Sequence, residues 1–334
     1  MAKTGIIGSG TWGTALAIHL ARIGHEVTVW SAFSSEIEAL KASYRHPNLP
    51  NAVIPETVSF TDDLENVCTG KDLLVLAVPS VFTRSTAAKM NKYIRYGQLI
   101  VNVAKGIEED TLFCQTEITK QEIPQAEVSV LSGPSHAEEV SVGLPTAVVV
   151  GSERRETAEY IQNIFMSSDF RVYVSKDIIG IETGGSLKNV IALAAGMLDG
   201  LGFGDNTMAA LITRGVSELA RLGEAMGCSK ETFYGLTGIG DLIVTCQSKH
   251  SRNRRAGVLM GQGATMEEAT KAVNQVVEGI YSAKAGRQLG EKYGVELPII
   301  EAVNKVLFEN KSAAEAAVEL MTRDKTSEIR DTEW

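Results

Sequence analysis

The sequence contains little cysteine, and the cysteines it has show no paired spacing. Four cysteines are spread over 334 residues, without a Cys-x-x-Cys pair or a paired-histidine pattern. Zinc sites and disulfide frameworks are recognised by such clustering, so neither is expected, and no metal site is predicted. We expect reduced, buried thiols at Cys68, Cys114, Cys228 and Cys246.

Basic charge and long apolar runs are also scarce. The 41 Asp and Glu residues outnumber the 32 Lys and Arg residues, whereas a general phosphate-backbone binder needs a basic face. No nucleic-acid partner is therefore expected. The longest uncharged apolar stretch, 190–198, is about half a membrane span, and Gly5, Gly8 and Gly10 interrupt the apolar N-terminus too early for a signal peptide. We expect a cytoplasmic protein without a membrane span.

The first half of the chain has a strand-and-helix pattern typical of a soluble globular protein. Short runs rich in valine, isoleucine and leucine are separated by helical-period segments such as 12–23 and 81–95. The runs are continuous rather than alternating, which predicts strands buried on both faces of a parallel sheet. These runs are TGIIG, EVTVW, DLLVLAVP, QLIVNVAKG, EVSVLSGP and TAVVVG.

The pattern changes near residue 178, where long helical segments rich in Ala, Gly, Leu and Met begin. No convincing strand run interrupts them. The sequence therefore predicts an α/β fold in which a doubly wound, Rossmann-type domain over 1–178 is followed by an all-helical domain over 179–334.

Three glycines at the start of the chain follow the spacing Gly8-x-Gly10-x-x-Gly13. Because they lie between a strand run and a helical run, they match the phosphate-binding turn of a dinucleotide fold, in which each glycine has its own role. A purely structural glycine turn is the alternative. NAD-selective turns have an acid about 20 residues further on and NADP-selective ones an arginine, but Ser31 and Ala32 are neither. This position therefore does not distinguish NAD from NADP.

Polar residues follow two of the later strand runs. Lys105 ends the apolar run QLIVNVAKG, and Gly133 and Ser135 precede a predicted helix with Glu138 and Glu139 in its first turn. Ligands of open α/β sheets bind at the carboxyl ends of the strands, so these residues are candidates for the site. A surface lysine and simple helix capping are the alternatives.

Lys188 lies within a helical segment whose same face carries only small residues. Partial burial on such a face would lower the pKa of the lysine toward a catalytically useful value. Asp241 could orient or tune that lysine; a lysine paired with an acid between helices, and a turn-forming aspartate, are the structural alternatives. The small neighbours are Gly184, Gly185, Ala192 and Ala195.

A basic cluster occurs near residue 252 of this net acidic chain. If Ser251 is the N-cap of a helix that runs to Gly261, several arginines would crowd the positive end of the helix dipole. A bound phosphate would remove that conflict, with Arg252 and Asn253 as donors. A nucleic-acid patch or a solvated basic turn is the alternative, although no aromatic residues interleave.

Seven segments follow one another over most of the chain: GSGTWGTALA, VAKGIE, SGPSHAEE, GGSLKNVIALAAGMLDGLGFGDN, TGIGDLIVTC, HSRNRRAG and VVEG. Together they resemble the bacterial NAD(P)-dependent glycerol-3-phosphate dehydrogenases. With the glycine turn, the resemblance implies cofactor contacts at Gly8, Gly10, Thr11, Trp12, Gly13, Lys105, Ala137, Arg252, Val276 and Glu278. It implies substrate contacts at Lys105, Gly133, Ser135, Lys188, Asp241, Ser251, Arg252 and Asn253. Lys188 matches the catalytic lysine, and we group Lys105 and Asp241 with it as catalytic candidates.

The resemblance implies reduction of dihydroxyacetone phosphate to sn-glycerol 3-phosphate with NAD(H) or NADP(H), in a cytoplasmic homodimer that supplies phospholipid synthesis. Family members often carry Arg or His where this chain has Ala32, so the preferred cofactor is not decided. Two other functions are considered: a β-hydroxyacid dehydrogenase, which also combines a Rossmann domain with a helix lysine, and a non-catalytic nicotinamide sensor.

Overall fold

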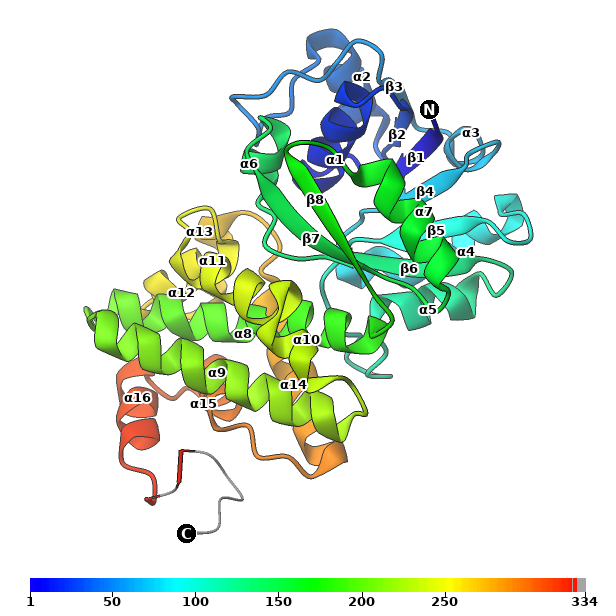
Figure 1. The fold of residues 1–334 in the computed structure, drawn as a ribbon. Helices are drawn as coiled ribbons and strands as arrows, with labels where there is room; N and C mark the ends of the chain where they lie inside the picture. The colour runs from blue at the N-terminus through cyan, green and yellow to red at the C-terminus, as the bar shows by residue number, and fades with distance from the viewer. Residues whose placement is uncertain (326, 329–334) are drawn as a thin grey trace.

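The structure is a computed structural model that describes residues 1–325, 327 and 328. Its first half is built on one eight-stranded sheet with the order β3-β2-β1-β4-β5-β6-β7-β8 (Figure 1). The strands are β1 Lys3–Ile7, β2 Glu26–Trp30, β3 Ser59–Thr61, β4 Leu73–Leu76, β5 Leu99–Asn102, β6 Glu127–Ser132, β7 Thr146–Gly151 and β8 Phe170–Ser175. The six predicted strand runs all form strands, and the Rossmann-type fold is confirmed.

The sheet differs from the prediction at one junction and at both edges. β7 runs antiparallel to β6, because the connection 133–145 contains one five-residue helix and returns the chain directly beside β6. β3 is only three residues long. β8 alternates buried and exposed residues along most of its length, as an edge strand covered on one face does. Neither β3 nor β8 contains a continuous apolar run, so that criterion does not predict them.

Helices cover both faces of the sheet because neighbouring strand residues point to opposite sides. Ile6 packs into the core beneath α1, α2, α6 and α7, whereas Ile7 packs into a second core beneath α3 and α4, near the end of α5. The helices are α1 Thr11–Arg22, α2 Ser34–Ser43, α3 Leu64–Cys68, α4 Thr83–Met90, α5 Gln115–Glu122, α6 Ala137–Ser141 and α7 Arg155–Phe165.

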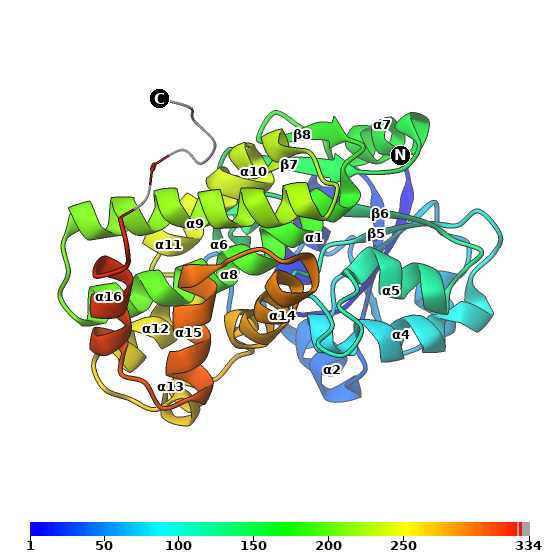
Figure 2. The same ribbon diagram turned by 90° about the horizontal axis from the view of Figure 1, so that it is seen from below.

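The second half is helical throughout its described residues and surrounds α8 (Figures 1 and 2). Every residue of α8 from Gly180 to Met197 is buried. In the described chain, α8 alone is long and apolar enough to cross a membrane, but most of it is enclosed by the protein. The helices are α8 Ile178–Gly200, α9 Asp205–Ala225, α10 Lys230–Tyr234, α11 Asp241–Gln247, α12 Arg252–Gly261, α13 Met266–Val273, α14 Glu278–Tyr293, α15 Pro298–Phe308 and α16 Ala313–Met321.

Glycines allow the backbones of α8 and α12 to lie in direct contact. A Cβ atom built on Gly196 would lie 2.1 Å from the carbonyl oxygen of Arg254, and one on Gly257 would lie 2.1 Å from that of Leu193. Any larger residue would force the two helices apart. This close packing fixes the start of α12, which carries Arg252, relative to the helix that carries Lys188.

Candidate active site

The glycine turn has the shape that a dinucleotide phosphate requires. Gly8 has φ +123°, and a Cβ there would lie 2.6 Å from the Ala77 carbonyl oxygen. A Cβ on Gly13 would lie 2.1 Å from the Gly8 carbonyl oxygen, so Gly13 lets α1 pack against the turn. Gly10 instead faces open space and precedes α1 with no side-chain cap. The free backbone N–H groups at this helix start fit a pyrophosphate.

Thr11 and Trp12 form the first residues of α1, beside this turn, and both are partly exposed. Their position leaves them accessible to a molecule bound at the helix start. Trp12 also packs against the core on this face of the sheet, which fixes the indole at the mouth of the turn.

Lys105 extends from the region just after β5 toward the helical half. Its Nζ atom donates hydrogen bonds to the Gly133 carbonyl oxygen at 3.2 Å and to Asp241 Oδ2 at 2.5 Å. The side chain is 24% exposed. The alternative of a solvated surface lysine is therefore wrong.

The turn after β6 also depends on a glycine. Gly133 has φ +148°, and a Cβ there would lie 2.9 Å from the Cα atom of Val148 on β7. Ser135 donates a hydrogen bond to the Gly133 carbonyl oxygen at 3.0 Å. Glu138 and Glu139 lie in the first turn of α6, as predicted, and Ala137 is its first residue.

Lys188 is buried between α8 and α11. Its Nζ atom lies 3.0 Å from Asp241 Oδ1 and donates a hydrogen bond to Thr245 Oγ1 at 2.6 Å. Only 4% of its side chain is exposed. Burial lowers the pKa of Lys188 from its usual 10.5 to about 8; Asp241 opposes this change, and Lys105 adds to it. The predicted direction is confirmed.

Small residues near Lys188 let other elements approach α8 closely. A Cβ on Gly185 would meet Ser132 Oγ at 2.9 Å, and one on Gly184 would meet the Thr237 carbonyl oxygen at 3.1 Å. Lys188 is thus a buried lysine paired with an acid between helices, which is the purely structural role considered for it from the sequence. The pair lies next to Lys105 at the carboxyl edge of the sheet, so the same geometry also suits a chemical role.

Asp241 joins the two halves of the protein, because each of its oxygens faces a different lysine. Burial opposes ionisation of Asp241, but Lys105 and Lys188 together outweigh it and hold the pKa of the carboxyl below its usual range. With both lysines charged, the cluster of Lys105, Lys188 and Asp241 carries a net positive charge. Such a cluster can stabilise negative charge that develops on a substrate oxygen.

The basic cluster begins α12 as predicted. Ser251 is the N-cap and accepts a hydrogen bond from the Arg254 backbone N–H at 3.2 Å. Arg254 pairs with Asp199 at 2.6 Å. Arg252 is exposed, and in the described chain it takes part in no ion pair.

Asn253 connects three helices at the same place. Its Nδ2 atom donates to Asn189 Oδ1 at 3.0 Å, and its Oδ1 atom accepts from the Gly279 backbone N–H at 2.8 Å. Within the described residues the second N–H of the amide donates to no protein acceptor. The amide is therefore held rigidly beside Arg252 at the start of α12.

Val276 and Glu278 lie where α13 leads into α14. Glu278 Oε2 accepts a hydrogen bond from Ser80 Oγ at 2.6 Å, which ties α14 to the loop after β4. Burial raises the pKa of Glu278, although the Ser80 hydrogen bond and the charge of Arg252 oppose that rise. Val276 is half-buried in the connecting loop.

Three neighbours of the cluster were not predicted from the sequence. Thr245 links Lys188 to the Asp241 carbonyl oxygen, to which it donates at 2.6 Å; its spacing four residues after Asp241 on a helix is a usable signal. His136 is the residue directly before α6 and makes no side-chain capping bond, and burial together with Lys188 lowers its pKa. The third is Ser80, the partner of Glu278, and no local pattern distinguishes it.

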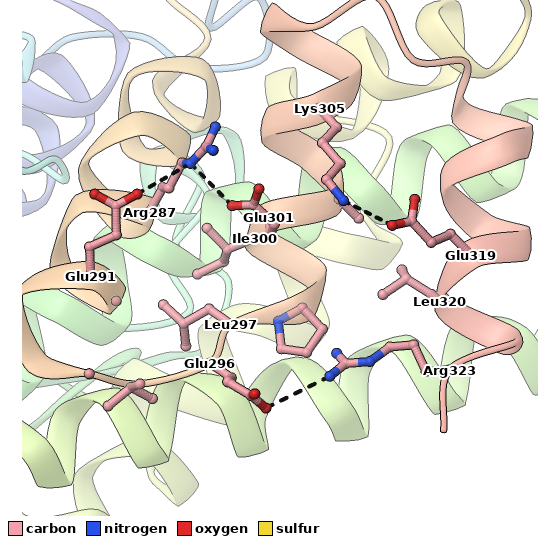
Figure 3. Close-up of a pocket in the computed structure, with 15 residues that line it drawn as sticks. Arg287, Glu291, Glu296, Leu297, Ile300, Glu301, Lys305, Glu319, Leu320 and Arg323 are labelled. Atoms are coloured by element: carbon pink, nitrogen blue, oxygen red, sulfur yellow. Dashed lines mark hydrogen bonds and ion pairs between the residues drawn. The ribbon is translucent and has the colours of Figure 1, made fainter. Parts of the chain in front are cut away.

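A cavity of about 480 Å³ lies elsewhere, between α14, α15 and α16 (Figure 3). Charged side chains at its rim pair with one another, as Arg287 does with Glu301 at 3.2 Å and Lys305 with Glu319 at 2.8 Å. None of the predicted site residues lines it. The chemistry-bearing residues instead gather where the sheet meets α8.

The fold and this site define a nicotinamide-dependent oxidoreductase. The family model described as the N-terminus of NAD-dependent glycerol-3-phosphate dehydrogenase matches residues 3–158, and the model of its C-terminus matches residues 177–318. The chain belongs to this family of NAD(P)-dependent glycerol-3-phosphate dehydrogenases.

Individual relatives agree over the full length of the chain. A glycerol-3-phosphate dehydrogenase [NAD(P)+] of Agathobacter rectalis is 59% identical over 100% of both chains, and one of Fusobacterium nucleatum is 58% identical over 99% of both. Among solved structures, a glycerol-3-phosphate dehydrogenase from Coxiella burnetii matches with a TM-score of 0.92 and 37% identity, covering 96% of this chain and 99% of that one. The predicted enzyme class and cofactor class are confirmed.

Proposed function

We propose that the protein reduces dihydroxyacetone phosphate to sn-glycerol 3-phosphate. The observation that carries this proposal is the buried cluster in which Asp241 lies between Lys105 and Lys188, at 2.5 Å and 3.0 Å. The cluster lies between the carboxyl edge of a dinucleotide-binding sheet and a helix start with a free arginine. Dihydroxyacetone phosphate carries its keto group on C2 and its phosphate on the adjacent C3, which suits a lysine cluster next to an anion-binding helix start.

Lys188 is the proton donor. As an ammonium it hydrogen-bonds the C2 ketone oxygen and gives up one proton as that oxygen becomes an alkoxide, so that the product is a neutral secondary alcohol. A pKa of about 8 keeps the group protonated at neutral pH and still makes it a better acid than a solvated lysine. A bound, reduced nicotinamide supplies the hydride for C2, and the reverse reaction uses neutral Lys188 as the base.

Asp241 and Lys105 position and charge the site. Asp241 holds the ammonium of Lys188 through an ion pair, and Thr245 holds it from a second direction. Lys105 adds a second positive charge from the sheet, close to where negative charge develops on the ketone oxygen. The two lysines come from different halves of the chain, so their meeting depends on how those halves pack together.

The phosphate of the substrate binds at the start of α12. Arg252 and Asn253 clamp it with charge-assisted and amide N–H donors, beside the N-cap Ser251, where the helix dipole also favours an anion. Binding energy at the phosphate thereby places C2 against Lys188. Gly133 and Ser135, at the end of β6, complete the substrate pocket.

A nicotinamide cofactor would be held at the carboxyl edge of the sheet. The turn formed by Gly8, Gly10 and Gly13, flanked by Thr11 and Trp12, would bind its pyrophosphate. Further contacts would come from Lys105, Ala137, Arg252, Val276 and Glu278, as the resemblance to the family implies.

We extend the proposal to the organisation of the protein. Residues 1–178 form the cofactor domain and residues 179–334 the substrate domain, and the start of α8 at Ile178, within one residue of this boundary, supports the division. The protein works as a cytoplasmic homodimer and supplies sn-glycerol 3-phosphate for phospholipid synthesis, as its resemblance to the family implies.

A steady-state assay tests the function. NADH and NADPH oxidation is followed with dihydroxyacetone phosphate as substrate, and NAD(P)+ reduction with a panel of 3-hydroxy acids. Turnover of dihydroxyacetone phosphate alone supports the proposal. Turnover of the 3-hydroxy acids instead identifies a β-hydroxyacid dehydrogenase, and cofactor binding without any turnover identifies a sensor; either result overturns it.

A further inference from the structure

An acidic side chain lies beside the glycine turn, where the sequence showed none. Glu36 is in the first turn of α2, yet its Oε2 atom accepts hydrogen bonds from Ser31 Oγ at 2.6 Å and from Ser9 Oγ at 2.8 Å. Ser9 stands between Gly8 and Gly10, and Ser31 directly follows β2. The carboxylate therefore joins the phosphate-binding turn to the end of the second strand.

This junction is where dinucleotide folds distinguish their cofactors. The adenosine ribose binds near the end of the second strand, where an acid accepts a hydrogen bond from the 2′-hydroxyl of NAD and an arginine accommodates the 2′-phosphate of NADP. Ser31 and Ala32 occupy the position where this acid or arginine usually stands, so they do not decide between NAD and NADP. The first turn of α2 brings Glu36 back to the same place.

We propose that Glu36 selects the cofactor: it accepts a hydrogen bond from the adenosine ribose 2′-hydroxyl of NAD(H) and repels the 2′-phosphate of NADP(H). The residue is exposed, so a ligand can reach it. Both of its side-chain hydrogen bonds go to Oε2, and within the described residues Oε1 accepts none. The inference rests on the proposed function only for the identity of the two competing cofactors.

The surroundings of Glu36 offer little positive charge to a phosphate. Among the described residues Glu36 takes part in no ion pair, and Ala32 is exposed and uncharged. His46 interacts with Glu36, which raises the pKa of this imidazole, but burial has the larger effect and lowers the pKa, so the charged form of the ring is disfavoured. A second carboxylate, Asp62, is fixed nearby by a 2.5 Å hydrogen bond from Ser34, a neighbour of Glu36 in sequence.

Lys41 lies on the same helix as Glu36, but it acts on Asp62. Lys41, on the last turn of α2, contributes to lowering the pKa of Asp62, after the hydrogen bond from Ser34 and a backbone hydrogen bond. A 2′-phosphate placed against Glu36 would bring about two further negative charges next to a carboxylate.

Direct binding titrations of the full-length protein test the proposal without any catalytic turnover. The dissociation constants of NADH and NADPH are measured from the change in nicotinamide fluorescence. We expect the native protein to bind NADH at least about 10-fold more tightly than NADPH, because like charges at contact distance cost that much even at a hydrated surface. Glu36→Gln should move the ratio of the two constants toward one, mainly by strengthening NADPH binding.

Two further variants separate selection from general effects. Glu38→Gln removes the same charge from an exposed position two residues further along α2 and should leave the ratio unchanged. Ala32→Arg adds a cation at the end of β2 and should strengthen NADPH binding on its own. The proposal is overturned if the native protein binds NADPH as tightly as NADH, or if Glu36→Gln and Glu38→Gln give the same ratio.

The outcome is independent of the substrate. A protein that shows the expected binding ratio but does not turn over dihydroxyacetone phosphate would refute the proposed function and leave the role of Glu36 intact. A protein that reduces dihydroxyacetone phosphate equally well with both cofactors and binds both equally would support the proposed function and refute the role of Glu36.

Discussion

Replacing Lys188 by methionine removes its ammonium group and keeps most of the length and apolar volume of the side chain. The Nζ atom that is lost lies 3.0 Å from Asp241 and 2.6 Å from Thr245. Asp241 keeps Lys105 as a partner at 2.5 Å, so the buried carboxylate is not left without a counter-charge. We therefore expect Lys188→Met to fold and to bind NADH with an unchanged dissociation constant.

The expected loss is in kcat. A positioned acid contributes about 10² to 10⁴ in rate, which corresponds to about 2.7 to 5.4 kcal/mol of transition-state stabilisation. The value should lie toward the upper end, because Lys188 is almost fully buried and water cannot easily replace it as a donor. The measurement is NADH oxidation with saturating dihydroxyacetone phosphate, beside a fluorescence titration of NADH on the same preparation.

The pH profile gives a second readout of the same substitution. Lys188 must be protonated to donate, and burial lowers its pKa to about 8. The rate of ketone reduction by the native protein should therefore fall above about pH 8, by tenfold per pH unit. This alkaline limb should be absent in Lys188→Met, whose residual activity no longer depends on that group.

Lys71 provides a matched control for the loss of a buried lysine. Its Nζ atom donates to Thr28 Oγ1 at 2.8 Å, and burial lowers its pKa, as it does for Lys188. Lys71 lies two residues before β4, at the opposite edge of the sheet from the cluster. Lys71→Met should keep kcat within about twofold of native. The reasoning fails if the two variants lose activity equally, or if Lys188→Met turns over near the native rate.

Three other predictions follow from the site and its surroundings. Arg252→Ala should raise KM for dihydroxyacetone phosphate about 30-fold, which corresponds to about 2 kcal/mol. Arg255 is an exposed arginine on the same helix, and Arg255→Ala should leave KM unchanged. Equal KM values for the two variants would show that Arg252 does not bind the phosphate. Asp241→Asn removes the carboxylate that raises the pKa of Lys188, so the alkaline limb of the pH profile should move to lower pH, and a limb that stays in place or moves up contradicts the assignment. Burial raises the pKa of Glu182 to about 7, although hydrogen bonds from Thr116 oppose that rise. Between about pH 4.5 and 7 the native state therefore holds a proton that the unfolded chain has released. The free energy of unfolding should fall by up to about 3 kcal/mol as pH rises through that window. Denaturant titrations at pH 5 and 8 should show that dependence reduced in Glu182→Gln, and parallel curves would refute it.

Much of the fold follows from patterns that are local in the sequence. The glycine turn, the buried strands and the start of α12 at Ser251 each depend on a few neighbouring residues, so spacing alone predicts them. β3 and β8 escape this approach because edge strands need no continuous apolar run. The reversal of β7 depends on the path of the loop 133–145, which no periodicity records.

The candidate site likewise combines residues that local patterns identify with contacts that only tertiary packing creates. Lys188, Lys105 and Asp241 stand out individually by their local settings, but only the packing of α8 against the sheet brings their side chains together. Glu36 is not evident from the sequence, because it does not lie directly after β2; the first turn of the next helix brings it back to the end of that strand. The functional roles given to these residues remain predictions until they are tested.

A ternary structure with NAD+ and sn-glycerol 3-phosphate tests the central claim most directly. We expect the Nζ atom of Lys188 to lie within about 3.2 Å of the C2 oxygen and the phosphate group to contact Arg252 at the start of α12. A complex in which that nitrogen points away from the substrate, or in which the phosphate binds elsewhere, would contradict it.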